Sequence, residues 1–377
     1  MKVPLRKTKK KGGLKARRAR GHLSLAPAVI ASSNPVRSAT SPDATVESLL
    51  AAVKRKGEAG REGREKVELA DLEEDGVLGE GAQGFVTRVI HTPSGLRMAV
   101  KHIRLIKASD TDEEAAGKRR KLITEAKTYM EAECVNIVSS FGTFVDDGMI
   151  KIVLEYMDGG CLSDHIPAIS SAVRAEKIQV IAGLAEQILN GLVYLHTEKH
   201  LVHRDIKPEN ILLSSDGIVK ITDFGVSKEV ESTLANCNTF VGTVTYMSPE
   251  RIDTLRAVAG YNYAADIWSL GIILVESAIG TYPYPSASAD QLLEHMHLVC
   301  EADPPLDTWL PPDEYPEDFR DFVSSCLVRD QTSRASALAL AQHPFIVSRD
   351  PSFDLAQWVR ERILEASTSP ATEAATE

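Results

Sequence analysis

The chain of 377 residues lacks the markers of several protein classes. Its five cysteines are scattered and form no CxxC pair, which argues against a disulfide framework and favours a reducing compartment. No apolar run approaches the roughly 18 residues that a membrane span needs, so we predict no membrane span. Hydrophobic residues at 43% and charged residues at 25% are close to the globular average, which excludes wholesale disorder and a fibrous repeat.

Acidic side chains are absent from residues 1–42, although the whole chain carries a formal net charge of -10. Ten basic side chains lie in residues 1–20, so the remainder carries a charge of -20. Such an acidic body is a poor candidate for general nucleic-acid binding. Residues 1–42 are rich in Lys, Arg, Ser and Pro and cannot build a core, so we predict a disordered basic tail.

Residues 43–66 are predicted to be a regulatory helix followed by a linker. Ser41 and Pro42 form a helix-start signal, and apolar side chains follow at helical spacing in residues 46–53. Residues 57–66 are Gly-rich and charged, as in a linker. The helix could inhibit the domain that follows or simply stabilise it, and both interpretations stay open.

Dense apolar periodicity in residues 67–350 predicts one two-lobed domain. In the N-lobe, about residues 67–155, the β-like runs 85–90 and 96–103 flank the turn sequence Thr-Pro-Ser-Gly. In the C-lobe, about residues 160–350, helical patterns dominate. One apolar stripe at helical spacing comprises Ile178, Ile181, Ala185, Ile188, Leu192 and Leu195. The expected fold class is therefore α+β, with a β-rich N-lobe and a mainly helical C-lobe.

The sequence GEGAQG at residues 79–84 matches a Gly-rich phosphate-binding pattern. Glycine lets the backbone approach phosphates closely. A dinucleotide-binding fold needs a helix directly after such a loop, whereas β-like residues follow it here. The pattern therefore favours a Gly-rich hairpin that covers a nucleotide, and an ordinary β-turn is the alternative.

Lys101 is a candidate phosphate ligand on the second predicted strand. Strand alternation places it on the same face as Ala99, beneath the Gly-rich hairpin. A lysine used in this way needs a carboxylate to hold it, and Glu125 in a helix predicted at residues 115–133 is the candidate. The alternative is a solvated surface lysine.

Polar side chains gather at one end of a predicted hairpin. The Asp-Gly dipeptide at residues 216–217, between two short apolar runs, predicts the hairpin turn. Folding about that turn places Asn210 opposite Asp223, and an amide oxygen beside a carboxylate suits Mg²⁺. Asp205 lies at the same end, where it can accept a proton from a hydroxyl. Lys207 can neutralise phosphate charge there.

These motifs together resemble the signature of the eukaryotic protein kinases. The matching sequences are the Gly-rich loop with Val86, AVK at 99–101, HRDIKPEN at 203–210 and DFG at 223–225. The resemblance implies ATP in a cleft between two lobes, with Lys101 on its α/β-phosphates and paired with Glu125. It also implies that Asp205 is the catalytic base and that Asn210 and Asp223 hold magnesium.

The resemblance further implies which residues contact the nucleotide and support the site. The implied nucleotide-binding residues are Leu78, Gly79, Gly81, Gly84, Val86, Ala99, Lys101, Leu154, Glu155 and Met157. Glu250 is implied to pair with Arg334, and Asp266 to brace the catalytic loop. Every catalytic position of the family is filled, which argues against an inactive member.

Two further segments resemble the MAP kinase kinases in particular. They are FVGTVTYMSPERI at residues 240–252 and MDGG at residues 157–160. This resemblance implies a dual-specificity kinase that phosphorylates Thr and Tyr in the activation loop of a MAP kinase. A Ser/Thr kinase of the related upstream class and a catalytically weak scaffold that binds MAP kinases are the alternatives.

Regulatory sites are implied after the DFG motif. Thr233 and Thr239 are the implied phosphorylation sites, and the five residues between them resemble the spacing in plant members of the family. Phosphate there would pair with arginine, for which Arg204 is the candidate. Thr243 resembles the family's threonine near the catalytic aspartate and is counted with the catalytic residues. Cys237 is either a redox site or a free surface thiol.

The basic tail resembles the motif by which this family docks on MAP kinases. The implied docking residues are Arg17, Arg18, Arg20, Leu23 and Leu25. The arginines would meet an acidic patch and the leucines shallow pockets. A nuclear address, a non-specific anion-binding tail and an organelle transit peptide are the alternatives. We therefore expect a downstream MAP kinase and an upstream MAP kinase kinase kinase as partners, no nucleic acid, and a cytoplasmic location, with the nucleus or an organelle as alternatives.

Residues 351–377 are predicted to contain one more helix and a disordered end. Residues 353–364 are amphipathic, and the sequence from residue 367 is of low complexity. In the family this region can dock the upstream kinase. Packing of Trp358 on the core is the other interpretation.

Overall fold

The computed structural model describes residues 67–81, 84–104, 129, 132–224, 244–253, 263–285 and 292–368. All of them belong to the unit Pro42–Glu377, one of the two units into which the chain divides. Several features singled out from the sequence lie outside the described residues. These are the docking motif at 17–25, the helix and linker at 43–66, Glu125, Thr233, Cys237, Thr239 and Thr243.

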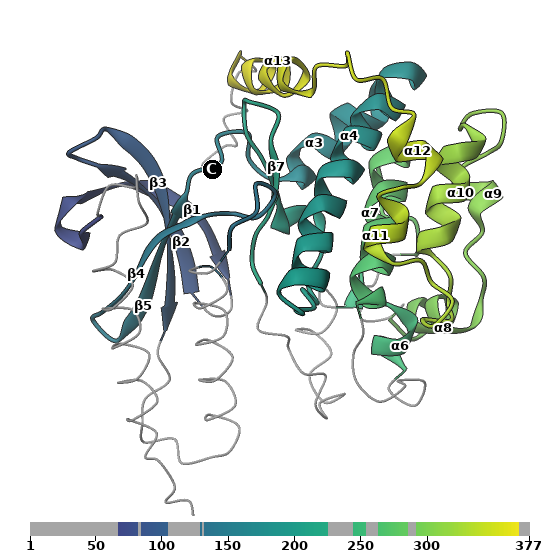
Figure 1. The fold of residues 1–377 in the computed structure, drawn as a ribbon, viewed down its shortest axis with the longest axis horizontal. Helices are drawn as coiled ribbons and strands as arrows, with labels where there is room; N and C mark the ends of the chain where they lie inside the picture. The colour runs from purple at the N-terminus through teal and green to yellow at the C-terminus, as the bar shows by residue number, and fades with distance from the viewer. Residues whose placement is uncertain are drawn as a thin grey trace, which may run out of the picture. The chain divides into compact units, whose positions relative to one another are not determined.

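The first part of the described chain is a five-stranded antiparallel sheet (Figure 1). A short 3-10 turn, η1 (Leu69–Asp71), precedes it. The strands are β1 (Leu72–Gly81), β2 (Gly84–His91), β3 (Leu96–Arg104), β4 (Ser140–Asp146) and β5 (Met149–Glu155), in the order β1-β2-β3-β5-β4. The two strands predicted around the Thr-Pro-Ser-Gly turn are confirmed as β2 and β3. In that turn, Ser94 and Gly95 donate backbone hydrogen bonds to the carbonyl of His91.

One face of this sheet carries a small apolar cluster of its own. Its buried members are Val67, Val89, Met98, Val100 and Val153. Side chains alternate between the two faces along a strand, so this cluster lies on the face opposite to Ala99 and Lys101. The other face of the sheet is therefore the one that carries the predicted nucleotide site.

The rest of the described chain is mainly helical, which confirms the predicted two-lobed α+β fold. Its longer helices are α3 (Leu162–Ser171), α4 (Arg174–Val193), α7 (Ala264–Ile279), α8 (Leu292–Glu301), α10 (Glu317–Cys326) and α13 (Leu355–Thr368). Its short ones are η2 (Tyr194–Glu198), η3 (Pro208–Asn210), α6 (Pro249–Ile252), α9 (Leu306–Trp309), α11 (Ala337–Leu340) and α12 (Pro344–Val347). Figure 1 shows α3, α4 and α7 side by side, and each contacts the other two.

Helix α4 carries the apolar stripe that the sequence predicts. Ile181, Ala185, Ile188 and Leu192 are fully buried, and the stripe ends at Leu195 in η2. Together α4 and η2 (Arg174–Glu198) are long and apolar enough to cross a membrane by length and composition alone. However, 67% of their most apolar window is buried inside the structure, as in the core helix of a folded domain.

Strands β6 (Ile211–Leu213) and β7 (Val219–Ile221) form the hairpin predicted around Asp216 and Gly217, and β7 packs on α4. The turn is longer than the predicted two-residue turn. Ser214 donates its N–H to the carbonyl of Ile218 at 2.9 Å, which leaves a three-residue loop at 215–217. Gly217 has φ of +73°, the left-handed conformation that ends such three-residue loops.

Helix α13 packs on α4 and on the β6–β7 loop. Trp358 and Val359 are buried, and the Trp358 Nε1–H donates to Glu176 Oε1 at 2.8 Å. Arg360 donates to the carbonyl of Ser215 at 3.0 Å. Packing of Trp358 is therefore observed, whereas docking of an upstream kinase stays a prediction.

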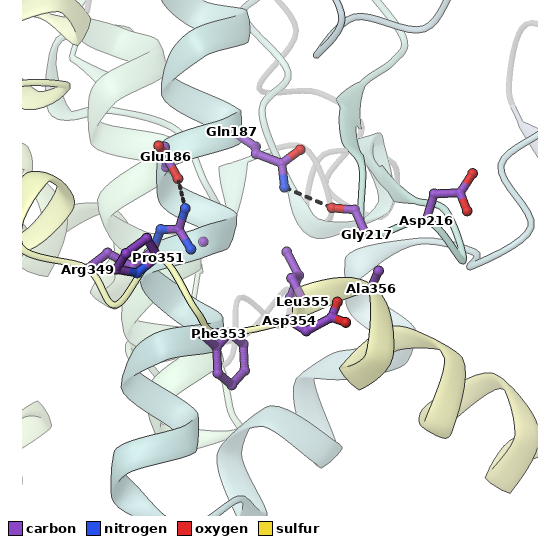
Figure 2. Close-up of a pocket in the computed structure, with 11 residues that line it drawn as sticks. Glu186, Gln187, Asp216, Gly217, Arg349, Pro351, Phe353, Asp354, Leu355 and Ala356 are labelled. Carbon is purple, nitrogen blue, oxygen red and sulfur yellow. Dashed lines mark hydrogen bonds and ion pairs between the residues drawn. The ribbon is translucent and has the colours of Figure 1, made fainter.

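The segment that leads into α13 lines an open, polar cavity of about 250 Å³ together with α4 and the β6–β7 loop (Figure 2). Across it, Arg349 pairs with Glu186 at 2.7 Å, and Gln187 Nε2 donates to the carbonyl of Gly217 at 2.9 Å. None of the predicted catalytic or nucleotide-binding residues lines this cavity. It belongs to the packing of the chain end, not to the predicted site.

Candidate active site

The Gly-rich sequence forms a tight hairpin between β1 and β2. Gly81 pairs with Gly84 across it, and Gly79 pairs with Val86. A side chain at position 84 would place its Cβ 1.7 Å from the carbonyl oxygen of His102, so only glycine fits there beside β3. A strand follows the loop, as the hairpin interpretation requires. Leu78 lies in β1 with 45% of its surface exposed.

The face of the sheet beside this hairpin carries four of the implied nucleotide-binding residues. Val86 lies opposite Lys101, and Ala99 lies opposite Leu154. Paired residues project to the same face of a sheet, and alternation places Ala99 and Lys101 on it together. Ala99 and Leu154 are buried, as is Met157 just beyond the end of β5. This apolar surface lies next to the Lys101 ammonium. The arrangement suits a nucleotide, whose base can pack on apolar side chains and whose phosphates are negatively charged.

Lys101 forms an ion pair with Asp223, through Nζ and Oδ1. Burial raises the pKa of Asp223, but the Lys101 ammonium, together with His203 and Lys207, lowers it more. The net result is a pKa below the ordinary value for aspartate, so the carboxylate is ionised near neutral pH. The partner implied for Lys101 from the sequence, Glu125, lies outside the described residues.

Asp205, Lys207 and Asn210 lie together after the loop that begins at His203. Lys207 Nζ lies 3.0 Å from Asp205 Oδ2. Asn210 Nδ2 donates to the same oxygen at 2.9 Å and to the Asp205 carbonyl at 2.7 Å. The Asp205 side chain remains 42% exposed, so its carboxylate is accessible to a second molecule.

The prediction that Asn210 lies opposite Asp223 is wrong by one residue. The register pairs Ile211 with Ile221, and Thr222 donates its N–H to the carbonyl of Asn210 at 2.9 Å. The three-residue loop is the reason, because it moves the centre of the hairpin by half a residue. Asp223 is therefore the first residue beyond the hairpin.

A buried carboxylate supports the backbone before Asp205. Asp266, in α7, accepts hydrogen bonds from the backbone N–H groups of His203 and Arg204, each at 2.8 Å. Its Oδ2 also lies 2.8 Å from His196 Nε2. Burial raises the pKa of Asp266, but its hydrogen bonds and the neighbouring histidines lower it more, so its pKa lies below the ordinary value. Arg204 has φ of +71°, a costly conformation for a residue other than glycine, and these bonds help to hold it.

Phe224 lies between two other rings. Its ring centroid is 4.7 Å from that of Tyr129 and 5.7 Å from that of His203. Tyr129 is fully buried, and its hydroxyl accepts the backbone N–H of Asp223 at 2.8 Å. The sequence alone assigns Tyr129 no role at the site. The signal that marks it is its position four residues after Glu125, one turn along the same predicted helix.

The segment after the implied phosphorylation sites is anchored by an ion pair. Arg334 donates to both carboxylate oxygens of Glu250, at 2.8 and 3.0 Å. The side chains are 0% and 6% exposed. This is the pairing that the resemblance implies. Nearby, the Tyr282 hydroxyl donates to the carbonyl of Thr245.

The residues present fit a divalent cation held jointly with a nucleotide. Asp223 supplies an ionised carboxylate. Both Nδ2 hydrogens of Asn210 point to Asp205, which leaves its carbonyl oxygen as the ligand atom. Within the described residues, no group of three or more His, Cys, Asp or Glu side chains could hold a metal. A hard cation would therefore need phosphate and water oxygens to complete its shell, as Mg²⁺ does at nucleotide sites.

The fold and this arrangement define the class of protein. Residues 72–346 match the protein kinase domain family, so the chain is a protein kinase and uses ATP.

Known proteins similar to this chain show which family of protein kinases it belongs to. The mitogen-activated protein kinase kinase SIPKK of Nicotiana tabacum is 41% identical over 284 residues, 75% of each chain. Mitogen-activated protein kinase kinase 2 of Arabidopsis thaliana is 38% identical over 292 residues, 76% of each chain. The MAP kinase kinase PBS2 of Saccharomyces cerevisiae is 36% identical over 301 residues, 79% of this chain and 43% of that one. The chain belongs to the MAP kinase kinase family, as its two specific segments predict, and not to the related upstream class.

Proposed function

We propose that this kinase transfers the γ-phosphoryl group of ATP to the Thr and the Tyr in the activation loop of a MAP kinase. The observation that carries the proposal is the meeting of Asp205, Lys207 and Asn210 in one hydrogen-bonded group. Membership of the MAP kinase kinase family supports the choice of substrate.

Asp205 is the residue that accepts the proton of the substrate hydroxyl. One of its oxygens is held by Lys207 and Asn210, and the carboxylate is exposed enough to meet a hydroxyl. As the hydroxyl oxygen bonds to the γ-phosphorus, the bond from that phosphorus to the bridging oxygen breaks and ADP leaves. Lys207 balances the charge of the transferred group, and Lys101 holds the α- and β-phosphates.

Mg²⁺ is the cation that we assign to Asn210 and Asp223. A divalent ion bound there with the nucleotide would supply positive charge that stabilises the transferring phosphate group. The protein's part is to present two oxygen ligands in fixed orientation. The bonds from Asn210 to Asp205 and from Lys101 to Asp223 support that role.

Activation and partner choice follow from family membership and from the sequence. We assign the activating phosphates to Thr233 and Thr239, added by an upstream kinase. Arg204 is the candidate partner for one of them. Residues 17–25 would dock the MAP kinase, since their arginines and leucines match an acidic patch next to shallow apolar pockets.

The test is a transfer assay with the variant Thr233→Asp/Thr239→Asp as the enzyme. It is offered a panel of catalytically inactive MAP kinases and a generic basic protein, and the phosphorylated residues are mapped by mass spectrometry. The same enzyme carrying Asp205→Ala is the control. We expect phosphate on both the Thr and the Tyr of one MAP kinase loop, dependent on Asp205. Phosphate on the generic protein alone would overturn the choice of substrate. No transfer by this variant or by upstream-activated protein would favour the scaffold interpretation.

A further inference from the structure

The backbone N–H of Asp223 donates its hydrogen bond to an acceptor outside the hairpin that precedes it. The last hydrogen bond beyond β6 and β7 joins the Thr222 N–H to Asn210, and Asp223 is one residue further on. Its N–H donates instead to the Tyr129 hydroxyl at 2.8 Å, across a sequence separation of 94 residues. Buried backbone donors are costly when they lack an acceptor. The Tyr129 hydroxyl thus accepts the hydrogen bond that a carbonyl of a neighbouring strand would accept inside a sheet.

The conformation of Asp223 makes this hydrogen bond consequential. Asp223 has φ of +58°, which side-chain-bearing residues adopt only when neighbours hold them there. The ring of Tyr129 packs edge-on against Phe224, and its hydroxyl lies 3.2 Å from Thr222 Oγ1. Tyr129 therefore contacts the residues on both sides of Asp223 as well as its N–H. The Thr222 hydroxyl can accept the Tyr129 proton, which leaves the Tyr129 oxygen facing the Asp223 N–H.

We propose that Tyr129 is a positioning residue for the cation-binding carboxylate, because its hydroxyl holds the backbone of Asp223 in the orientation that aims the side chain at Lys101. This inference rests on the proposed role of Asp223 as a ligand of the nucleotide-bound cation. It adds a link from Asp223 to the segment predicted as the helix 115–133, in which Tyr129 lies. The proposed role depends on the hydroxyl oxygen of Tyr129, since the apolar ring alone could provide the packing on Phe224.

The variant Tyr129→Phe tests this oxygen, because it keeps the ring and removes only the acceptor. The chain offers a matched control in Tyr194→Phe. The Tyr194 hydroxyl accepts the backbone N–H of Glu133 at 2.8 Å, and its side chain is also buried. Both variants lose one hydroxyl that accepts a backbone N–H. Only Tyr129 touches Asp223, so a loss of stability common to both is separated from an effect on cation binding.

The measurement is ADP binding to the full-length chain by calorimetry, with and without Mg²⁺. We expect Tyr129→Phe to weaken ADP binding in Mg²⁺ by about three- to tenfold, the equilibrium effect of one lost hydrogen bond. Binding without Mg²⁺ should stay at the wild-type value, and Tyr194→Phe should match wild type in both conditions. The Mg²⁺ concentration that gives half-maximal transfer should rise by a similar factor for Tyr129→Phe alone.

Equal Mg²⁺ dependence in Tyr129→Phe and Tyr194→Phe would overturn the inference. If Tyr129→Phe folds poorly, Thr222→Val provides a second test, because it removes the hydroxyl that lies 3.2 Å from the Tyr129 oxygen. Thr222→Val should shift the Mg²⁺ dependence in the same direction, and an unchanged dependence would also count against the inference. The proposed function fails separately, if wild-type protein binds ADP with Mg²⁺ but phosphorylates no MAP kinase.

Discussion

Lys220 and Glu155 form an ion pair that joins the end of β5 to β7, with Nζ and Oε1 2.8 Å apart. Glu155 is one of the nucleotide-binding residues implied by the resemblance to protein kinases, and Lys220 lies three residues before Asp223. The same Glu155 oxygen accepts the N–H of Ser139 at 2.6 Å. The Lys220 side chain is 9% exposed and the Glu155 side chain 24% exposed, so most of the pair is shielded from water. It connects the strand beside the predicted nucleotide site with the strand that leads to Asp223, the proposed cation ligand.

Lys220→Met is expected to lower the free energy of unfolding by about 1–3 kcal/mol, because Glu155 then keeps a mostly buried charge without its cation. Urea unfolding measures this loss. Lys151→Met is the control, since Lys151 pairs at 2.6 Å with Asp146, whose side chain is 50% exposed. That exposed pair should contribute about 1 kcal/mol or less. Equal losses in the two variants would show that the Lys220 pair has no special role.

Arg334→Ala is expected to lower the free energy of unfolding by about 3–5 kcal/mol, more than Lys220→Met, because it leaves the buried Glu250 carboxylate without its cationic partner. Arg334 also donates to the carbonyls of Ala264 and Val328, which would lose these donors. Chemical unfolding followed by circular dichroism measures the change. Arg329→Ala is the comparison, since its partner Asp303 is 87% exposed and its other acceptors are the carbonyls of Cys300 and Glu301, and it should cost about 1–2 kcal/mol. A loss below about 1 kcal/mol for Arg334→Ala would contradict the prediction.

Asp266 predicts a dependence of stability on pH in the acid range. Its pKa in the folded protein is lowered below the value of about 3.9 in the unfolded chain. The carboxylate therefore contributes stability that is present above about pH 4 and is lost as the pH falls through the folded-state pKa. Asp266→Asn should be less stable than wild type at pH 7, and the gap should narrow below about pH 4.

Thermal unfolding between pH 7 and pH 3 measures this gap. Asp216→Asn is the control, because Asp216 is exposed in the β6–β7 loop. It should follow the wild-type melting temperature throughout the range. A gap for Asp266→Asn that stays constant down to pH 3 would contradict the expectation.

Asp205→Asn is expected to lower kcat by about 100- to 10,000-fold, the usual contribution of a positioned proton acceptor. The amide keeps nearly the same shape but cannot take up the proton of the substrate hydroxyl. The KM for ATP should stay within about twofold of wild type, because Asp205 is not among the nucleotide-binding residues. Steady-state kinetics on the preferred MAP kinase separate the two parameters. A kcat within tenfold of wild type would exclude Asp205 as the base.

Local patterns in the sequence predict the elements that carry the site. The strands β2 and β3 follow from alternation around one turn, and α4 follows from a stripe at helical spacing. The error at Asn210 arose from a single loop. An Asp-Gly dipeptide fits a two-residue turn, but Gly217 instead ends a three-residue loop in the left-handed conformation. Loop length decides register, and dipeptide preferences do not determine loop length.

Contacts between distant parts of the chain could not be predicted in this way. Lys101 and Asp223 are 122 residues apart, and Tyr129 and Asp223 are 94 apart. Periodicity describes only which face of an element a residue occupies. Which faces meet depends on tertiary packing, so the ion pairs of Lys101 and Lys220 and the hydrogen bond from Asp223 to Tyr129 emerge only from the structure.

Helix α13 is packed on the kinase domain and extends the folded domain beyond the part that matches the family. The match to the family ends at residue 346, yet Trp358 and Val359 are buried further along. Gly217 approaches this helix so closely that a Cβ there would lie 2.5 Å from the backbone nitrogen of Ala356. A catalytic domain cut after Ile346 would lack Trp358 and would expose to water the surface that Trp358 covers. The autonomous folding unit is thus longer than the stretch by which the family is recognised, and a boundary drawn by similarity alone would cut through its core.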